Sequence, residues 1–483
     1  MTAEQVAIPQ ESQRAGVGSV YGLLRAQAER FPANDLFVLP AAVQALWSIG
    51  RAGWTYAETL DEVDTLAARY RAAGYGPGHR VALLMENRPA HFFHWLALNA
   101  IRVCAVPVNP DYTADELRYL LDHSDSCLFV HLPSRAAQAG EGAAGLAVRL
   151  VASDAAALPP ASSPARHPPE DATQAECALI YTSGTTGRPK GCLLSNAYFH
   201  GWSEWYCAQA GRISLREGQE RLMTPLPTFH VNAMGNSFMG MLASGGAQII
   251  IDRFHPRSWW EVARETRATC FHYLGVMPAI LLALPEAEGE RDHGLRFGMG
   301  GGVHPDHHAT FEARFGVPLL EGWAMTETGG AGILCAAEEP RHVGARCVGR
   351  PDRPGPPLEM RLVGDDGSDV APAAPGELLL RASGPDPRHR FFSGYLKNEA
   401  ATEQVWAGGW LHTGDIMRRG DDGSLFFVDR KKNIIRRSGE NIAAVEVEAA
   451  IGTHPDVAQV AVVAVLDPLR GEEVLAVVVP RAP

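Results

Sequence analysis

The sequence predicts an α/β fold with a largely parallel sheet, divided into more than one domain. Short apolar runs at residues 80–85 and 103–108 are bounded by polar residues, as is typical of buried strands. A stretch with helical spacing at residues 89–101 lies between them, and this alternation favours parallel strands joined by helices. A chain of 483 residues is also longer than one hydrophobic core usually serves.

Further elements follow in chain order. Apolar residues at helical spacing predict an amphipathic helix over residues 21–31. Residues 248–251 and 377–381 have the composition of further strands. The segment 155–169 is rich in Ala, Pro and Ser, and we expect it to be a surface connection.

A change from charged to hydrophobic residues near the C-terminus indicates a domain boundary. Two hydrophobic strands are predicted at 457–466 and 474–480, beyond a charged stretch at 429–437. We place the boundary in that stretch, with a large domain over 1–430 and a hinge and small domain over 431–483.

Composition excludes several classes of protein. The formal charge of −12 argues against a nucleic-acid surface, which normally needs a basic patch. The eight cysteines are scattered without a CxxC pair, so we expect reduced thiols and no disulfide framework or zinc site. The N-terminus lacks the layout of a signal peptide, and no apolar run is long enough to span a bilayer. We therefore expect a soluble, cytoplasmic protein.

The most informative motif is the loop at 182–191, TSGTTGRPKG, which follows an apolar strand. Glycines allow main-chain N–H groups to approach a ligand closely, hydroxyls add donors, and a lysine adds a positive charge, as a polyphosphate requires. The residues concerned are Thr182, Ser183, Gly184, Thr185, Thr186, Gly187 and Lys190. Arg188 and Pro189 separate the last glycine from the lysine, so this is not a Walker A loop. The simpler alternative is a Gly/Thr surface turn.

At this loop the sequence resembles the acyl-adenylate-forming superfamily, which includes acyl- and aryl-CoA synthetases, peptide-synthetase adenylation domains and luciferases. The resemblance implies a large multi-subdomain N-terminal domain with mixed sheets flanked by helices, and a small α+β lid domain that is incomplete here. It also implies ATP, Mg²⁺ and coenzyme A as ligands, a small carboxylic acid as substrate, and coenzyme A or another thiol or acyl-carrier as the acceptor. Thr186 and Lys190 are then expected at the metal and the phosphates.

A second segment, GWAMTETGG at 322–330, is similar to that family's aromatic-Gly-Met-Thr-Glu segment. The resemblance implies that Trp323 stacks on the adenine, Thr326 contacts the α-phosphate and Glu327 helps to hold Mg²⁺. An indole face and a hard carboxylate ligand suit these roles. Trp323 and Ala324 depart from the usual Tyr and Gly, and a Trp near a Thr-Glu pair is, by itself, more often part of a core.

The segment GMGGGVHP at 298–305 resembles the turn that lines the adenine and acyl pockets, which assigns Gly301 and Gly302 to the nucleotide. Three histidines follow closely, but their spacing fits no metal site that we recognise, and we expect solvated side chains. They are His304, His307 and His308.

Near the predicted boundary, LHTGD at 411–415 ends in Asp415, which by resemblance accepts both ribose hydroxyls. Arg430 is then expected at the ribose or α-phosphate, and Lys432 at the hinge of the small domain. Gly439 and Glu440 lie where the family forms its pantetheine tunnel. A solvated basic strand is the plain alternative for this run.

The acyl pocket is assigned by the same resemblance. His230, in PLPTFHVNA, is expected to border the substrate carboxylate. The expected pocket walls are Val231, Met234, Phe271, Gly275, Gly300 and Gly302. The glycines favour a roomy pocket. The local sequence is most similar to the carnitine-CoA ligase branch. No acidic residue stands out as a partner for the quaternary ammonium of carnitine, so carnitine is not assigned as the substrate.

One family feature is absent from this sequence. The family places a lysine near the end of its lid domain, whereas none of the 51 residues after Lys432 is lysine. The sequence is then either a shortened form or a naturally short protein. Three functions stay open: an acyl- or aryl-CoA synthetase, a natural-product enzyme that uses only the adenylate step or turns it to chemistry such as diazotisation, and a non-catalytic nucleotide-binding relative.

Overall fold

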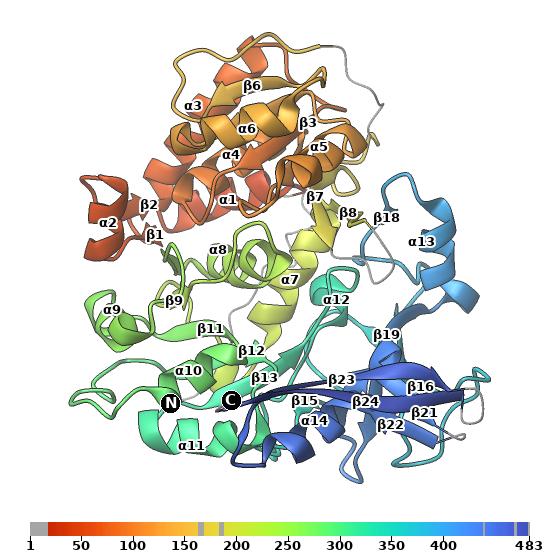
Figure 1. Cartoon of the computed structure of the whole chain (residues 1–483). Helices are drawn as coiled ribbons and strands as arrows, with labels where there is room; N and C mark the ends of the chain where they lie inside the picture. The colour runs from red at the N-terminus through yellow and green to blue at the C-terminus, as the bar shows by residue number, and fades with distance from the viewer. Residues whose placement is uncertain (1–17, 163–168, 183–187, 438–439, 468–470, 482–483) are drawn as a thin grey trace.

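The computed structural model describes residues 18–162, 169–182, 188–437, 440–467 and 471–481 (Figure 1). The described residues form four sheets, three in a large N-terminal part and one in a small C-terminal part. The expected α/β fold, with mixed sheets in the large domain, is confirmed. None of the helices in these ranges has the length and apolar character needed to cross a membrane.

One sheet of the large domain has seven strands. They are β3 (Arg80–Leu84), β4 (Cys104–Pro107), β5 (Leu128–His131), β6 (Arg149–Ala152), β7 (Glu176–Thr182), β8 (Lys190–Ser195) and β18 (Gly394–Tyr395). The first five pair in parallel, whereas β8 runs antiparallel to both β7 and β18. The central strands β3, β4 and β5 are buried along their whole length, as is usual where helices cover both faces of a parallel sheet.

The helices around this sheet are α1 (Val20–Arg30), α3 (Tyr56–Ala72), α4 (Pro89–Ala100), α5 (Ala114–His123) and α6 (Ala136–Ala143). Capping boxes start two of them, because Thr55 pairs with Glu58 at α3 and Thr113 pairs with Glu116 at α5. The helix expected at 21–31 is α1, and the one expected at 89–101 is α4.

A second sheet has eight strands, mostly parallel. They are β1 (Asp35–Val38), β2 (Gly53–Thr55), β9 (Arg221–Thr224), β10 (Ala247–Ile250), β11 (Cys270–Leu274), β12 (Phe297–Gly301), β13 (Leu319–Trp323) and β14 (Leu334–Cys335). Its helices are α2 (Ala41–Trp47), α7 (Asn196–Ala208), the π-helix η4 (Asn232–Met239), α8 (Gly240–Ser244), α9 (Trp259–Glu265), α10 (Val276–Ala283), α11 (Pro305–Phe315) and α12 (Gly329–Gly332).

The third sheet of the large domain is wholly antiparallel. Its strands are β15 (Cys347–Gly349), β16 (Leu358–Val363), β17 (Gly376–Ala382), β19 (Leu411–Arg419) and β20 (Leu425–Arg430), and α13 (Glu399–Val405) lies between β18 and β19 in the chain. Short 3₁₀ turns occur at η2 (Pro133–Arg135), η3 (Gly211–Ile213), η5 (Pro256–Ser258), η6 (Ala407–Gly409) and η7 (Lys431–Asn433).

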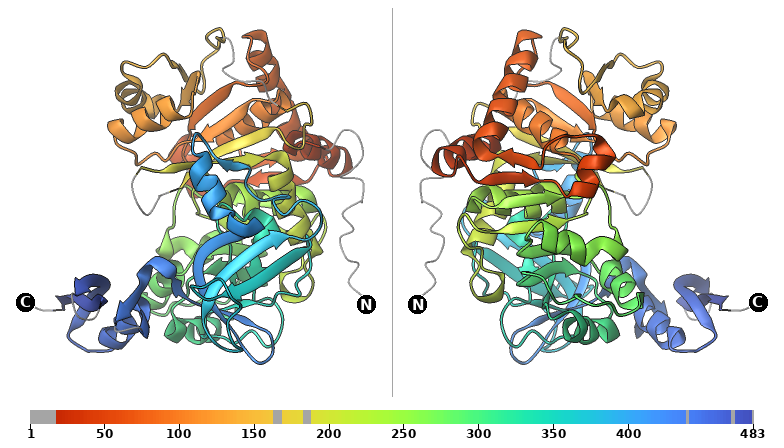
Figure 2. Two further views of the ribbon diagram at one scale, coloured as in Figure 1. Left: turned by 90° about the vertical axis from the view of Figure 1, so that its right-hand side faces the viewer. Right: turned by 90° about the vertical axis from the view of Figure 1, so that its left-hand side faces the viewer.

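The small domain follows η7. It contains β21 (Ile434–Arg437), β22 (Glu440–Ala443), α14 (Ala444–Gly452), β23 (Val457–Asp467) and β24 (Gly471–Pro480). Its sheet is antiparallel in the order β22-β21-β24-β23. In Figure 2 this domain, in dark blue, extends from one side of the large domain. The strands expected at 457–466 and 474–480 are β23 and β24.

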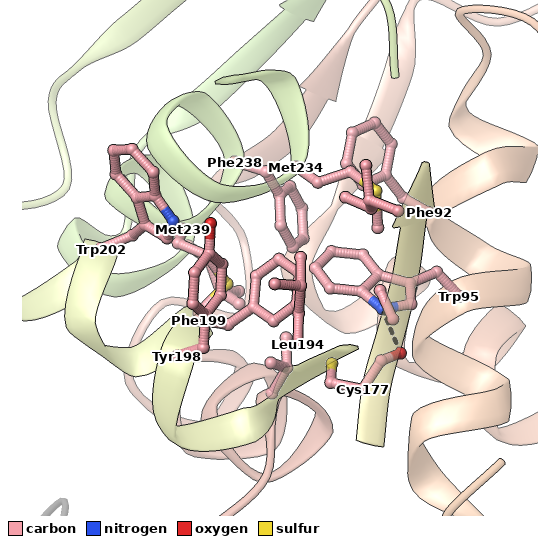
Figure 3. Close-up of a cluster of buried hydrophobic side chains, with 14 of the residues drawn as sticks. Phe92, Trp95, Cys177, Leu194, Tyr198, Phe199, Trp202, Met234, Phe238 and Met239 are labelled. Atoms are coloured by element: carbon pink, nitrogen blue, oxygen red, sulfur yellow. Dashed lines mark hydrogen bonds between the residues drawn. The ribbon is translucent and has the colours of Figure 1, made fainter. Parts of the chain in front are cut away.

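An aromatic core joins the first two sheets (Figure 3). Phe92 and Phe238 stack with ring centroids 4.6 Å apart, and the Trp95 indole donates a 3.2 Å hydrogen bond to the Cys177 carbonyl. Met234 of η4 is fully buried in this same cluster. Aromatic residues bury large areas, so this packing fixes η4 and α7 beside the ends of β11 to β13.

Candidate functional site

The strands β7 and β8 carry the two ends of the predicted phosphate loop. Thr182 and Lys190 are direct neighbours in the antiparallel ladder that joins β7 to β8. Ser183, Gly184, Thr185, Thr186 and Gly187 lie outside the described residues, and their roles stay predictions. The Lys190 ammonium lies 4.8 Å from the centroid of the Tyr395 ring, which is within the range of a cation–π contact.

Glu327 lies next to the same tyrosine. Its carboxylate is 7% exposed, and Oε1 accepts a 2.7 Å hydrogen bond from the Tyr395 hydroxyl. The Cys192 thiol is 3.9 Å from the same oxygen. Burial raises the pKa of Tyr395, and the neighbouring Glu327 charge raises it further, so the hydroxyl stays protonated and donates. Two strands, β8 and β18, and the turn between β13 and α12 therefore bring Lys190, Tyr395 and Glu327 together, although about 200 positions separate Lys190 from Tyr395.

Thr326 precedes Glu327 in the chain, but its side chain does not line the cavity described below. Its carbonyl accepts a 2.8 Å hydrogen bond from the Tyr198 hydroxyl of α7, which holds the backbone in place. The predicted contact of Thr326 with the α-phosphate stays a prediction.

A cavity of about 410 Å³ lies at the ends of β11, β12 and β13. On the side of the third sheet it is lined by Asp415, Phe427 and Arg430, together with Trp323 of β13. On the side of α7 and η4 it is lined by Trp202, Val231, Asn232 and Asn236. Gly300, Gly301 and Gly302 form its floor between these walls.

Trp323 and Asp415 form the best defined contact at this cavity. The indole Nε1 donates a 2.7 Å hydrogen bond to Oδ2 of Asp415, which is 5% exposed. Arg430 is the direct neighbour of Asp415 across β19 and β20, and its Nε lies 3.5 Å from Oδ1. Burial raises the pKa of Asp415, although the Trp323 hydrogen bond and the Arg430 charge oppose this. The arrangement supplies a carboxylate with free lone pairs beside a flat aromatic ring.

The glycines of the predicted pocket serve backbone packing. A Cβ atom at Gly300 would lie 2.2 Å from the Tyr273 carbonyl oxygen, and one at Gly275 would lie 1.7 Å from that of Gly302. Gly275 is not among the residues that line the cavity. These glycines allow β11 and β12 and their following turns to approach closely, so their presence does not by itself widen the pocket.

Two predicted wall residues lie in the core instead. Met234 packs in the aromatic cluster of Figure 3, and Phe271 packs with Trp259 at a ring distance of 5.6 Å. Neither lines the cavity, because both point into apolar layers away from it. Val231 does line it. His230 lies at an exposed position one residue before Val231, and desolvation by surrounding atoms lowers the pKa of its imidazole.

The histidine group after Gly302 differs in part from expectation. His304 is half exposed and accepts a hydrogen bond from the Asp306 N–H at the start of α11. His308 is buried, and its Nε2 lies 2.9 Å from the Leu319 carbonyl oxygen, so the prediction of a solvated side chain is wrong there. Within the described ranges, no three His, Cys, Asp or Glu side chains form a possible metal cluster.

The expected hinge falls at η7, the single turn between the third sheet and the small domain, and Lys432 belongs to it. Its neighbour Lys431 donates a 2.8 Å hydrogen bond to Glu377 of β17. Glu440 begins β22, and Gly439 lies outside the described residues. The hinge and tunnel roles stay predictions.

Sequence reasoning missed Tyr395, Asn232 and Asn236. Tyr395 lies on a two-residue strand that pairs with β8, and no local pattern announces a role for it. The two asparagines occur in VNAMGN, beside the expected His230, where polar residues in an apolar run would have been a usable signal.

Comparison with known proteins agrees with this geometry. Residues 24–396 match the model of the AMP-binding enzyme family, and residues 446–483 match that of the AMP-binding enzyme C-terminal domain. The sulfoacetate–CoA ligase of Cupriavidus necator is 32% identical over 472 residues, covering 95% of this chain and 87% of that protein. The crotonobetaine/carnitine–CoA ligase of Shigella flexneri serotype 5b is 31% identical, covering 88% and 84%.

Among solved structures, o-succinylbenzoate CoA synthetase from Bacillus subtilis, in complex with an acyl-adenylate intermediate, shares the fold. Its TM-score is 0.78 at 23% identity, covering 95% of this chain and 88% of that one. The expected resemblance to acyl-CoA synthetases, including the carnitine-CoA ligase branch, is confirmed. The chain therefore belongs to the AMP-binding enzyme family, as an AMP-forming acid–thiol ligase.

Proposed function

We propose that this enzyme activates a carboxylic acid with MgATP in the cavity at the ends of β11 to β13 and then transfers the acyl group to coenzyme A. The observation that carries the proposal is the convergence of Lys190 from the first sheet, Glu327 from the turn after β13 and Asp415 from the third sheet around one site. Glu327 and Asp415 are close enough for the charge of Glu327 to act on the pKa of Asp415. A nucleotide needs such separate contacts for its phosphates, metal and ribose.

The nucleotide is held at two places. The Asp415 carboxylate accepts the ribose hydroxyls while the Trp323 N–H fixes its orientation. The indole then offers its face to the base across the cavity from Gly301 and Gly302. At the other end, Lys190 and the loop that precedes it bind the β- and γ-phosphates.

The donor set near Glu327 fits Mg²⁺. Glu327 is a buried carboxylate with one oxygen already oriented by Tyr395, and no cage of three carboxylate or imidazole ligands exists among the described side chains. Mg²⁺ commonly takes one or two protein carboxylates and completes its octahedron with phosphate oxygens and water. Glu327, with Thr186 from the loop, would hold the ion, whose charge would help to neutralise the phosphates.

The chemistry then needs alignment and charge stabilisation. The substrate carboxylate attacks the α-phosphorus, the bond to pyrophosphate breaks, and an acyl-adenylate forms. Lys190 stabilises charge that grows on the departing pyrophosphate. We assign His230 to the border of the substrate carboxylate, because it precedes the cavity residue Val231 and desolvation lowers its pKa toward the neutral form. We assign Arg430, whose Nε lies 3.5 Å from Asp415, to the ribose or the α-phosphate.

The second step uses the small domain. The thiol of coenzyme A attacks the acyl carbon. The bond between that carbon and the phosphate oxygen breaks, AMP leaves with the oxygen, and a thioester results. We place the hinge for this step at η7 with Lys432, and the approach of the pantetheine arm at Gly439 and Glu440. Movement about a short connection of this kind is a common way to present two active faces in turn.

Pyrophosphate release tests this function. A panel of acids is offered with ATP and Mg²⁺, with and without coenzyme A, and thioester and AMP are measured together with pyrophosphate. We expect release with at least one acid and a thioester only when coenzyme A is present. Release of pyrophosphate without thioester would restrict the enzyme to the adenylate step, and ATP binding without any release would contradict catalysis.

A further inference from the structure

The wall of the cavity formed by η4 is a π-helix, a rare element that is frequently found at functional sites. Two glycines let it approach its neighbours. A Cβ atom at Gly235 would lie 2.6 Å from Nε1 of Trp202, and one at Gly240 would lie 2.4 Å from the Tyr206 ring. This close packing places Asn232 and Asn236, four residues apart, on the same cavity.

A buried chain of hydrogen bonds ends at Asn232. The Ser237 hydroxyl lies 3.4 Å from Oδ1 of Asn232 and 2.8 Å from Nδ1 of His272. The Tyr206 hydroxyl lies 3.1 Å from the other ring nitrogen of His272, Nε2. His272, Ser237 and Tyr206 are all fully buried.

The donor and acceptor in each of these hydrogen bonds follow from the neutral state of His272. Burial lowers the pKa of His272 to about 3, so the ring has one donor nitrogen and one acceptor nitrogen. Ser237 donates to Asn232, so it accepts from Nδ1 of His272, and Nε2 then accepts from Tyr206. The carbonyl of Asn232 therefore has one donor within the protein, and we take its Nδ2 as the donor available to the cavity.

Asn236 supplies the complementary group. Its side chain is 4% exposed, and Nδ2 lies 3.7 Å from the Met299 sulfur. Among the described residues, Oδ1 of Asn236 has no hydrogen-bond partner. A buried acceptor without a partner is unfavourable, and because Asn236 also lines the cavity, we take its Oδ1 as the acceptor for a ligand group that donates.

The charged residues at this cavity belong to its other side. Asp415 and Arg430 form the ribose contact described above. Arg346 donates to the Val428 carbonyl and stacks on Phe427 of β20, and Glu321 accepts from the Val303 N–H. The wall formed by η4 thus offers only neutral amides.

On these grounds, and resting on the proposed function, we propose that the acid substrate carries a neutral group that both accepts and donates a hydrogen bond, a hydroxyl or a carboxamide, away from its carboxylate. Nδ2 of Asn232 donates to this group, and Oδ1 of Asn236 accepts from it. A plain hydrocarbon tail would leave both amides unpaired. An ionised tail would be desolvated without an opposite charge.

Matched acids test the proposal. The pairs are 3-(4-hydroxyphenyl)propanoate with 3-(4-methylphenyl)propanoate, and 6-hydroxyhexanoate with heptanoate; 6-sulfohexanoate is the charged member. The kcat/KM of pyrophosphate release is measured for each, together with binding of the same acids to the AMP-loaded protein by calorimetry. We expect the hydroxyl acid of at least one pair to exceed its partner at least tenfold in both measurements.

Variants assign that preference to the wall. Asn236→Leu and Ser237→Ala should each reduce the hydroxyl-over-methyl ratio at least fivefold, whereas Ile333→Val, at another part of the same cavity, should leave the ratio unchanged. Thermal melting of each variant checks folding, and Ser237→Ala keeps the test valid if Asn236→Leu does not fold.

The two proposals fail differently. A hydroxyl preference in binding without pyrophosphate release from any acid would contradict the proposed function and support the polar wall. Equal binding and turnover of the two members of each pair, a preference for the sulfonate, or a ratio unchanged in both wall variants would overturn the wall proposal. Absence of both binding and turnover for every acid would overturn both.

Discussion

The indole nitrogen of Trp323 is hydrogen-bonded to the carboxylate of Asp415 at 2.7 Å, across 92 residues of sequence. The contact joins the second sheet to the third and fixes the ring that we propose for the adenine relative to the carboxylate that we propose for the ribose. Both side chains are almost fully buried, so neither can be reoriented without disturbing the other.

Trp323→Phe should weaken ATP binding while keeping an aromatic face. The substitution removes the N–H donor and leaves a buried carboxylate with one partner fewer, which costs about 1–3 kcal/mol. We expect the KM for ATP to rise at least fivefold with little change for the acid. Trp410→Phe is the matched control, since Trp410 stacks on Arg381 away from the cavity. An unchanged KM for ATP in Trp323→Phe would contradict the orienting role.

Lys190→Ala should slow pyrophosphate release. Losing one charged partner of the phosphates weakens transition-state stabilisation by about 1–3 kcal/mol, or roughly 5- to 150-fold in kcat/KM. The chain has only four lysines, and Lys397→Ala removes one from an exposed ion pair with Asp125. That control should retain the wild-type rate. Equal rates for the two variants would remove Lys190 from the site.

Tyr395→Phe separates the two contacts of this tyrosine. The ring under Lys190 is kept, but the hydroxyl that donates to Glu327 is lost. A hydrogen bond to a charged group contributes about 1.5–3 kcal/mol, so Glu327 should be held less firmly. We expect the Mg²⁺ concentration for half-maximal activity to rise severalfold. If the Mg²⁺ dependence stays as in the wild type and only stability falls, Tyr395 has a structural role alone.

Asp415→Asn should stabilise the fold while weakening ATP binding. Burial raises the pKa of Asp415 in the folded state above its unfolded value, so ionisation costs stability. That cost is absent below the unfolded pKa, develops as pH rises through the folded pKa, and is complete above it. The variant should therefore melt higher than the wild type at pH 7, and the difference should shrink toward pH 4. A lower melting temperature at pH 7 would show that the Trp323 and Arg430 contacts outweigh burial.

Gly275→Ala should destabilise the protein. The new methyl group would lie 1.7 Å from the Gly302 carbonyl oxygen, and overpacking of this kind costs about 1–3 kcal/mol. Gly76→Ala is the control, because nothing lies within 4 Å of its Cβ position. A melting temperature equal to that of Gly76→Ala would mean that the turn after β11 relaxes freely.

Local sequence was enough to predict much of this protein. The strands at 80–85 and 103–108 and the helix between them follow from apolar periodicity, which depends only on near neighbours. The segments that carry Lys190, Trp323, Glu327 and Asp415 were recognisable because each is a short run whose residues must stay together to bind one part of a nucleotide.

Only the tertiary structure decided which side chains meet. Met234 and Phe271 have the character of pocket walls, yet they face apolar layers, because the side of a helix or strand that is buried depends on what packs against it. Tyr395 reaches Glu327 through a strand pairing that no local pattern encodes. The series of hydrogen bonds from Tyr206 through His272 and Ser237 to Asn232 likewise joins side chains of three separate elements, α7, β11 and η4. The sequence by itself determined the fold class and the family, and it predicted the segments that bind the nucleotide, because local patterns carry them. Long-range packing decided the partners and orientation of each functional group, because contacts between distant segments form only when the sheets assemble.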